Sequence, residues 1–300
     1  MPAIGVLGPS YCGSTLLNYM LGSHPSIYGG SELRRLFDAD PRRRCAVCGP
    51  ACRLWTRENL ATANQAGPGG LYDFLRNLTD RPVICDASKS VDHFLRIAPE
   101  PFTWVVMTKH PLRSLASFTI NRLYRDTSAP DLAQARGSVT DEEFTAFVRE
   151  QVKRLAKFYA HVERERAYFE SHGDVVYLSY EQVATAPEEA LKTVLDGSGL
   201  TVDPTMLDYA SKEHHPIGGN TGPHSQARRK AGRSRTWTGR ATYNRHFYES
   251  TDGIRLDDKW RDAFTDRQIE LVTGARGFAA LCTRLGYDQS HDPRRPVAHP

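Results

Sequence analysis

A glycine-bounded loop near the start of the chain has the most informative residue spacing. The apolar run Ala3–Leu7 ends at Gly8, and Gly13-Ser14-Thr15 follows before a helical pattern. This is the spacing of a phosphate-binding loop, in which backbone amides at a helix N-terminus hold a phosphate. In nucleotide triphosphatases, a lysine at the position of Ser14 reaches the β- and γ-phosphates. The loop therefore predicts a phosphate-bearing ligand other than ATP. The candidate binding residues are Ser10, Tyr11, Cys12, Gly13, Ser14, Thr15 and Leu16.

A second pattern places a cation and a hydroxyl after another apolar run. The run Trp104–Thr108 leads into KHPLRSLAS, where Lys109 and Ser117 lie eight residues apart. Pro111 suits the first turn of a helix, so we expect Lys109 at a strand tip and Ser117 on the following helix. The pair could grip a second phosphate. On these residues alone, solvated cations and a packed serine are an equally good interpretation.

Composition limits the class of protein. The chain has 300 residues, of which 40% are hydrophobic, which is enough for one large core or a core with a small subdomain. The apolar runs are strand-sized, so we expect no stable membrane insertion. No charged-then-apolar leader precedes the first strand, which predicts a cytoplasmic protein with reduced cysteines.

The positive charge is concentrated late in the chain. The net charge is +4, and seven cations occupy a stretch without an acidic residue before Glu249. They are Arg228, Arg229, Lys230, Arg233, Arg235, Arg240 and Arg245. Such a cluster favours phosphates or an acidic acceptor. We expect no nucleic-acid partner, because no stacking or recognition-helix motif accompanies the cluster.

Strand and helix patterns alternate along the chain. The expected strands are Ala3–Leu7, Pro82–Cys85, Thr103–Thr108 and Val175–Leu178, and the expected helices are Ser14–Leu21, Leu112–Leu123, Asp141–Phe169 and Pro187–Leu195. Thr140 and Glu143 form a capping signature before the third helix. The alternation predicts an α/β fold, a P-loop-type three-layer α/β/α sandwich with a central, mostly parallel sheet. Ligands then bind where strands end and helices begin.

Three stretches do not fit this alternation. Residues 38–70 are rich in Arg, Cys, Gly and Pro and predict an irregular excursion. Residues 215–253 predict a mobile basic loop, and the tail 289–300 is expected to be disordered. We expect residues 1–288 to form a single domain.

Together, the motifs resemble those of sulfotransferases that use 3′-phosphoadenylyl sulfate (PAPS). The first loop resembles their 5′-phosphosulfate loop, and KHPLRSLAS resembles their 3′-phosphate motif, with Lys109 at the usual arginine position. The segment VYLSYEQVATAP is similar to the family's YEDL…P element, whose tyrosine matches Tyr180. HPIGGN, which ends at Asn220, and IRLDDKW look like segments of bacterial members. The resemblance extends from residue 3 to about residue 287.

The resemblance implies a donor, a product and contacts for each. PAPS would be the donor, adenosine 3′,5′-bisphosphate the product, and no metal would be required. Lys109 and Ser117 would hold the 3′-phosphate together with Arg229 and Lys230 of the basic loop. Asn220 is the alternative to these two loop cations. Tyr180 would contact the adenine region. Tyr11 departs from the family, since many members carry a basic residue there.

A carboxylate is the candidate base. The stretch SHPSIYGGSELR resembles the HP…GEE-x-R segment of tyrosylprotein sulfotransferases, which implies that Glu32 is the base and Arg34 a nearby cation. A carboxylate at a strand's end, near cations and the loop, suits a base if partial burial raises its pKa. In the alternative interpretation, Glu32 is a helix N-terminal acid that pairs with Arg34 or Arg35. His24 and His110 are alternative bases.

The segment Asp86-Ala87-Ser88-Lys89 ends another predicted strand. The family often carries an Asp-Ser-x-Lys element at this place, which implies that Lys89 neutralises the bridging oxygen of the leaving group. Ser88 could assist. The alternative is that Lys89 is a solvated strand-tip lysine.

Three cysteines follow one another closely as Cys45-x2-Cys48-x3-Cys52. They could supply three thiolate ligands, with a fourth such as Cys85 or a distant histidine. Zinc sites usually draw on two paired clusters, and only one is present. We therefore expect reduced, partly buried thiols and no metal.

The sequence thus predicts a sulfotransferase that moves a sulfonate group from PAPS to a hydroxyl of a small-molecule or glycan acceptor. A carbohydrate, a natural product and a lipid alcohol are all compatible acceptors. The alternatives are a P-loop kinase with an aberrant loop, in which Asp86 would bind magnesium, and a non-enzymatic module that binds polyanions through Arg228–Arg245.

Overall fold

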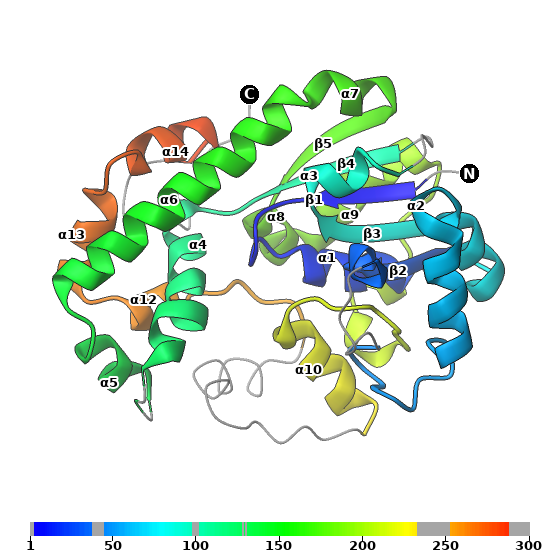
Figure 1. The fold of residues 1–300 in the computed structure, drawn as a ribbon, viewed down its shortest axis with the longest axis horizontal. Coiled ribbons are helices and arrows are strands. Elements are labelled where there is room, and N and C mark those ends of the chain that lie inside the picture. The colour runs from blue at the N-terminus through cyan, green and yellow to red at the C-terminus, as the bar shows by residue number, and fades with distance from the viewer. Residues whose placement is uncertain are drawn as a thin grey trace.

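The computed structural model describes residues 3–37, 45–97, 102–127, 129, 131–232 and 253–287. Five strands form one sheet in the order β2-β3-β1-β4-β5, and every neighbouring pair is parallel. Their bounds are β1 Ala3–Leu7, β2 Ile27–Ser31, β3 Val83–Lys89, β4 Phe102–Thr108 and β5 Gly173–Ser179. The predicted α/β class is confirmed, and the described sheet is entirely parallel (Figure 1).

Strand β2 was not predicted, because its sequence IYGGS reads as a turn. Its first glycine, Gly29, is required by close packing against the first helix. A Cβ atom at Gly29 would lie 2.7 Å from the carbonyl oxygen of Asn18, so no side chain fits between strand and helix. The other four strands include the predicted ones. Burial of β1 and β4 on both faces explains their continuous apolar sequences.

The helices cover both faces of the sheet. They are α1 Ser14–Gly22, α2 Arg57–Thr79, α3 Val91–Phe94, α4 Pro111–Phe118, α5 Leu132–Gly137, α6 Asp141–Arg164, α7 Arg166–Ser171, α8 Tyr180–Thr185, α9 Pro187–Leu195, α10 Thr221–Lys230, α12 Trp260–Ala263, α13 Asp266–Thr273 and α14 Phe278–Arg284. Phe94 of α3 and Phe169 of α7 pack on Trp104 of β4, which places both helices on one face. Helix α1 lies on the other side of the strands in Figure 1, so the protein has three layers.

Two predicted irregular stretches contain helices. Within 38–70, the described part includes the start of α2, which Thr56 caps by accepting a hydrogen bond from the Asn59 amide at 3.1 Å. The Gly-Pro-Gly-Gly sequence interrupts α2, because Gly67 has φ 65° and two helical stretches meet there across a kink. Within 215–253, residues 221–230 form α10. Residues 38–44 and 233–252 and the predicted disordered tail 289–300 lie outside the described residues.

The predicted helix 141–169 is interrupted at Glu165, which separates α6 from α7. The predicted capping signature is confirmed, since Thr140 and Glu143 form a reciprocal capping box. Predicted helix 112–123 ends as α4 at Phe118 and continues as a π-helical turn over Thr119–Leu123.

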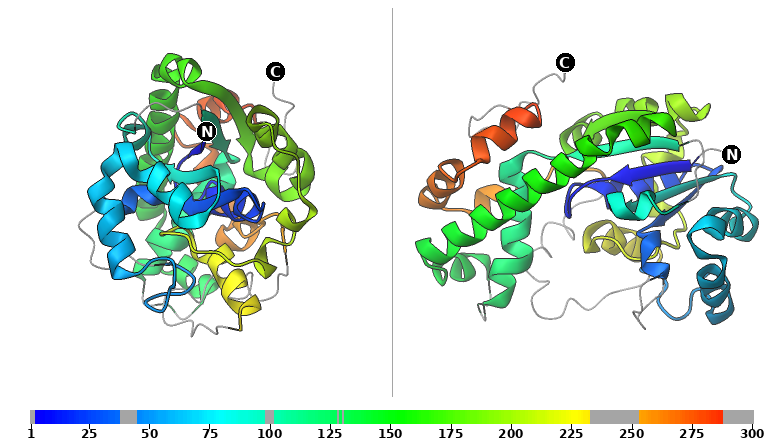
Figure 2. Two further views of the ribbon diagram at one scale, coloured as in Figure 1. Left: turned by 90° about the vertical axis from the view of Figure 1, so that its right-hand side faces the viewer. Right: turned by 45° about the horizontal axis from the view of Figure 1, so that its top comes forward.

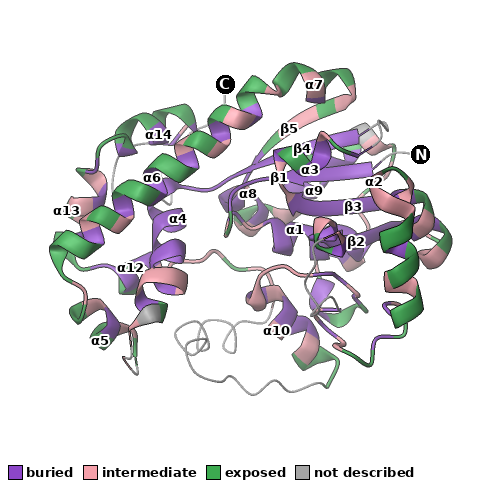
Figure 3. Cartoon of the chain, viewed as in Figure 1, coloured by how far each residue is buried: buried purple, intermediate pink, exposed green. Residues whose placement is uncertain are grey.

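The buried residues form two hydrophobic clusters. One surrounds the sheet, and the other lies among α4, α5, α6 and α12–α14. Phe158 of α6 packs against both clusters, so this long helix connects them (Figure 2). Figure 3 shows that strands β1 to β4 are buried, whereas β5 is partly exposed and the helices have exposed outer faces. Among the described residues, no helix has both the length and the apolar character needed to cross a bilayer.

Candidate active site

Five of the predicted site positions follow the strands at the carboxyl edge of the sheet. Because all five strands are parallel, their carboxyl ends meet at this edge. Loop 8–13 follows β1, Glu32 follows β2, Lys89 ends β3, Lys109 follows β4 and Tyr180 follows β5. Such an edge is where open parallel sheets bind ligands.

The loop after β1 presents the start of α1. The Leu17 amide bonds to the Gly13 carbonyl at 3.1 Å, and within the described chain no side chain caps the helix. The preceding helical amides are therefore available to an anion. The buried Ser14 hydroxyl has no oxygen or nitrogen partner among the described residues, and its neighbour is the Cys12 thiol. A buried hydroxyl in this position is well placed to bind a ligand oxygen.

Gly13 is required by geometry on two counts. Its φ is 95°, and a Cβ atom there would lie 2.6 Å from the Tyr180 ring. Tyr180 therefore packs directly against the loop. Of the remaining loop residues, Ser10 is exposed, whereas Cys12, Thr15 and Leu16 are buried.

Asn220 joins the loop from a distant part of the sequence. Its backbone amide donates to the Thr15 hydroxyl at 3.0 Å, and Asn220 also precedes the first residue of α10. The bond leaves the Thr15 proton able to donate to a ligand. Arg229 and Lys230 lie at the other end of α10, about 14 Å along the helix axis.

Glu32 lies between two cations. Its Oε1 is 2.5 Å from the Lys89 Nζ, and its Oε2 pairs with the Arg35 Nε. The Glu32 and Lys89 side chains are 6% and 11% exposed. Arg35, rather than the predicted Arg34, is thus the arginine that pairs with the carboxylate. The Arg34 amide instead donates to the Ser88 hydroxyl at 2.9 Å.

The expected rise in the pKa of Glu32 is wrong. Burial does raise the pKa, but Lys89 and Arg35 outweigh burial and lower it below its ordinary value. Glu32 is therefore a carboxylate at neutral pH. Each of its oxygens keeps a second lone pair, so the carboxylate can still accept a hydrogen bond.

Lys89 also lies close to the loop. Burial raises the pKa of the Cys12 thiol, and Lys89 is the largest opposing charge, with Lys109 a smaller one. Lys89 thus stands between Glu32 and the loop rather than in solvent.

Lys109 and Ser117 meet as the sequence predicted. The Lys109 Nζ donates to the Ser117 Oγ at 3.1 Å and to the Tyr11 carbonyl at 3.4 Å. It also lies 4.7 Å from the centre of the Tyr180 ring. Burial lowers the pKa of Lys109, an effect that the neighbouring Asp257 opposes. Lysine and hydroxyl together lie where they can bind a second anion beside the loop.

The segment 254–260 contributes residues that sequence reasoning did not assign. The Asp257 amide donates to the Tyr180 hydroxyl at 2.9 Å, and the Asp257 carboxylate pairs with Lys259 at 3.2 Å. Burial raises the pKa of Asp257, but Lys259 and Lys109 outweigh it and lower the pKa. Lys259 is therefore a further cation near this subsite. The only sequence signal was the resemblance of IRLDDKW to a family segment.

Two histidines considered as bases have structural roles. His110 caps α4 by accepting from the Leu112 amide at 3.2 Å, and its ring packs on Tyr287. His24 precedes β2 and accepts from the Ser26 amide at 3.0 Å. It therefore lies at the amino end of the strand, opposite the site.

Asp86 and Ser88 are also engaged within the fold. The Asp86 carboxylate is fully buried and accepts from the Tyr72 hydroxyl at 2.9 Å and the Ser88 amide at 2.8 Å, and it pairs with His93 at 2.8 Å. The Ser88 hydroxyl donates to Asp86. These contacts hold the end of β3 and thereby orient Lys89.

Backbone strain is concentrated at the site. Tyr11, Ser31 and Lys89 have φ of 68°, 61° and 65°, and within the described chain the only other non-glycine residue with positive φ is Asp80. This conformation costs on the order of 1–3 kcal/mol per residue and tends to occur at functional sites. At Lys89 it redirects the chain just where the side chain meets Glu32.

The three clustered cysteines are joined by His215. Cys45, Cys48, Cys52 and His215 bring their ligand atoms within 4.8 Å of one another. Cys85, considered as a fourth ligand, lies in β3 instead. A distant histidine was the other fourth ligand considered from the sequence, and His215 is a histidine in that position.

Comparison with known proteins concerns mainly the fold. No family model matches the chain, and no curated protein matches it. The sulfotransferase domain from the curacin biosynthetic pathway is similar, with a TM-score of 0.52 and 17% identity over 96% of this chain and 99% of that one. The sulfotransferase domain from the Synechococcus PCC 7002 olefin synthase has a TM-score of 0.46 and 18% identity over 91% of this chain and 93% of that one.

Proposed function

We propose that this chain, which shares the fold of a sulfotransferase domain, transfers a sulfonate group from PAPS to a hydroxyl of a small-molecule or glycan acceptor. The observation that carries the proposal is a pair of separate anion subsites at one sheet edge. One is the amide-lined start of α1, with Ser14 where a triphosphatase has lysine. The other is the Lys109–Ser117 pair, joined at 3.1 Å.

The two subsites suit a donor with phosphates on opposite sides of one ribose. The amides and hydroxyls of Ser14 and Thr15 would hold the 5′-phosphosulfate, and Lys109 with Ser117 would hold the 3′-phosphate. Tyr180 lies between them, against Gly13 and beneath Lys109, where it could bound the nucleoside. When bound, PAPS supplies an activated sulfonate and a stable bisphosphate leaving group.

The residues around Glu32 suit the transfer itself. Glu32 would accept a hydrogen bond from the acceptor hydroxyl and take its proton as the oxygen attacks sulfur. Lys89 would donate to the bridging oxygen that departs with the bisphosphate. Positioning of the two reacting groups and stabilisation of the developing charge are the main catalytic effects that such a site can supply.

The kinase alternative is disfavoured by Asp86. A magnesium-binding carboxylate would have to face the phosphates, whereas Asp86 is fully buried and bonded to Tyr72, Ser88 and His93. The polyanion-binding alternative depends largely on cations at 233–245, which lie outside the described residues.

Calorimetry and a transfer assay test the proposal. We expect adenosine 3′,5′-bisphosphate to bind without magnesium and more tightly than ATP with magnesium. We also expect radiolabelled sulfonate to pass from PAPS to members of a panel of sugars, phenols and lipid alcohols. Preference for ATP with magnesium, or salt-sensitive oligonucleotide binding with no turnover on any acceptor, would refute it.

The base is tested separately with Glu32→Gln. This variant should retain bisphosphate binding and lose transfer by roughly 10²–10⁴-fold, the usual contribution of a general base. Glu163→Gln, on the half-exposed surface of α6, is the matched control and should transfer at the wild-type rate. Unchanged turnover in Glu32→Gln would remove Glu32 from this role.

A further inference from the structure

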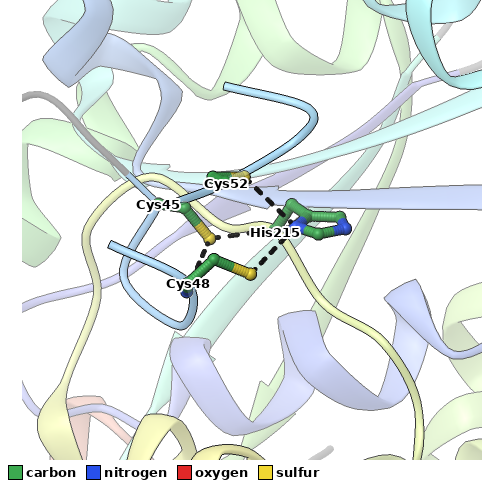
Figure 4. A group of neighbouring side chains, drawn as sticks. All are labelled: Cys45, Cys48, Cys52 and His215. Carbon is green, nitrogen blue, oxygen red and sulfur yellow. Dashed lines mark hydrogen bonds between the residues drawn. The ribbon is translucent and has the colours of Figure 1, made fainter. Parts of the chain in front are cut away.

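The cluster of Cys45, Cys48, Cys52 and His215 has the chemistry of a metal site. Figure 4 shows the three sulfur atoms grouped around one edge of the imidazole ring. The cysteines come from the segment after residue 44 and the histidine from the segment before α10, more than 160 residues away. We propose that these four residues bind one structural zinc ion, and this proposal goes beyond sulfonate transfer and does not depend on it.

The distances fit a tetrahedral site. The His215 Nδ1 lies 3.3 Å from the Cys52 Sγ, 3.4 Å from the Cys48 Sγ and 4.0 Å from the Cys45 Sγ. With Zn–S of about 2.3 Å and Zn–N of about 2.0 Å, a tetrahedron separates sulfur from nitrogen by about 3.5 Å and sulfur from sulfur by about 3.8 Å. The observed sulfur–nitrogen separations bracket the first value, and all four atoms lie within 4.8 Å of one another, so an ion fits after shifts of up to about 1 Å.

The groups around the ligands support the same assignment. The Cys48 amide donates to the Cys45 Sγ, and the Trp55 amide donates to the Cys52 Sγ, both at 3.3 Å. Such bonds favour sulfur in the anionic form that binds metal. On the far side of the ring, the His215 Nε2 lies 3.1 Å from the Glu213 carboxylate. This carboxylate–histidine contact presents Nδ1 to the cluster and is typical of metal-binding histidines.

The types of ligand atom in the cluster favour zinc over other metals. Three sulfurs and one imidazole in a closed arrangement are the ligands of structural zinc sites. Iron–sulfur clusters are mostly held by four cysteines. Calcium and magnesium require oxygen ligands. All six cysteines of the chain lie within the described ranges, and none forms a disulfide.

The zinc would link the cysteine segment to the stretch of chain around His215 that contacts the candidate base, Glu32. Next to its ligands, the Ala46 amide donates to the Pro216 carbonyl at 2.9 Å. Two residues after His215, the Ile217 carbonyl accepts from the Glu32 amide at 2.8 Å, and the Ile217 amide donates to the Gly30 carbonyl at 2.9 Å. The ion would therefore hold in place the segment that is hydrogen-bonded to the end of β2 and to the backbone amide of Glu32.

Metal analysis of the full-length chain tests the proposal. The protein is purified without chelators, and its zinc and iron contents are measured by mass spectrometry. We expect about one zinc per chain, as for a single four-ligand site. The reduced, metal-free protein should also bind Co²⁺ with the visible absorption of tetrahedral thiolate coordination. Neither readout involves sulfonate transfer, so this proposal and the enzymatic one can fail independently.

Variants separate ligands from bystanders. Cys48→Ser and His215→Ala should lose zinc, whereas His215→Cys should keep it because four ligands remain. Glu213→Gln should weaken zinc binding by about 10–100-fold, the usual effect of removing a partner of a metal-bound histidine. Cys85→Ser changes a buried cysteine outside the cluster and should retain a full equivalent. Circular dichroism would establish that each variant is folded.

Four results would overturn the proposal. The first three are wild-type protein that binds neither Zn²⁺ nor Co²⁺ after reduction, iron in place of zinc, and a disulfide among the three cysteines in unreduced protein. Zinc retained by both Cys48→Ser and His215→Ala would place the metal elsewhere and overturn it as well.

Discussion

The ion pair between Lys89 and Glu32 should control the pH range of the enzyme. The two charged atoms are 2.5 Å apart, and both side chains are largely buried. Lys89 is the strongest of the contributions that lower the pKa of Glu32. In the wild type, Glu32 should therefore remain ionised between pH 5 and 8. We expect no acid limb from this carboxylate in the pH profile of kcat/KM over that range.

Replacing the cation exposes the effect of burial. In Lys89→Met, burial continues to raise the pKa of Glu32, and only Arg35 opposes it. At an effective dielectric constant of about 20, opposite charges 4 Å apart interact by about 4 kcal/mol. Loss of the Lys89 charge removes most of the attraction that lowers the pKa, and Arg35 offsets only part of that loss. We therefore expect the pKa of Glu32 to rise above its wild-type value in Lys89→Met.

The assay is the pH dependence of kcat/KM for sulfonate transfer at constant ionic strength. Lys89→Met should be slower by about 10²–10³-fold, as for loss of one donor to developing charge, and should gain an acid limb at higher pH than any in the wild type. Lys89→Arg keeps the charge and should keep the wild-type profile shape. A variant that is slow but has an unchanged profile would refute the electrostatic link between Lys89 and Glu32.

Three further predictions concern other parts of the structure. Lys109→Met should weaken binding of adenosine 3′,5′-bisphosphate by about 10–100-fold, since a charged hydrogen bond contributes about 1.5–3 kcal/mol. Lys109→Arg should bind nearly normally in the same calorimetry, and equal affinity of both variants would contradict the second subsite. Gly13→Ala should lower Tm and bisphosphate affinity, because φ is 95° and the new Cβ would lie 2.6 Å from Tyr180. Gly137→Ala, where nothing lies within 4 Å, is its control, and equal behaviour of the two would count against the loop geometry. Burial, followed by Arg228, lowers the pKa of His224 to about 4. Its neutral ring therefore stabilises the fold above the unfolded-state pKa of about 6.5, by on the order of 3 kcal/mol, and this stabilisation is lost as the pH falls to about 4. Urea unfolding at pH 7 and pH 4 should show a smaller acid loss in His224→Gln, and an identical loss would contradict the prediction.

The sequence alone determined the elements whose signals are local. Continuous apolar runs marked β1 and β4, because strands buried on both faces need no alternation. The start of α6 could also be predicted, because the two residues of its capping box, Thr140 and Glu143, lie only three positions apart in the sequence. The phosphate-binding loop and the Lys109–Ser117 pair could be predicted from the sequence because each lies within one strand-to-helix unit.

Only the tertiary structure decided the contacts between segments that are distant in sequence. Strand β2 could not be predicted from its own sequence, because Gly29 is explained by the packing of α1 against the strand. The pKa of Glu32 depends on Lys89, 57 residues away, so an argument from burial alone predicted the wrong sign. His215 is more than 160 residues from the three cysteines in the sequence, so only the tertiary structure could show that it lies beside them. Side-chain chemistry at a site depends on distances in space, and those are set by the packing of the whole sheet.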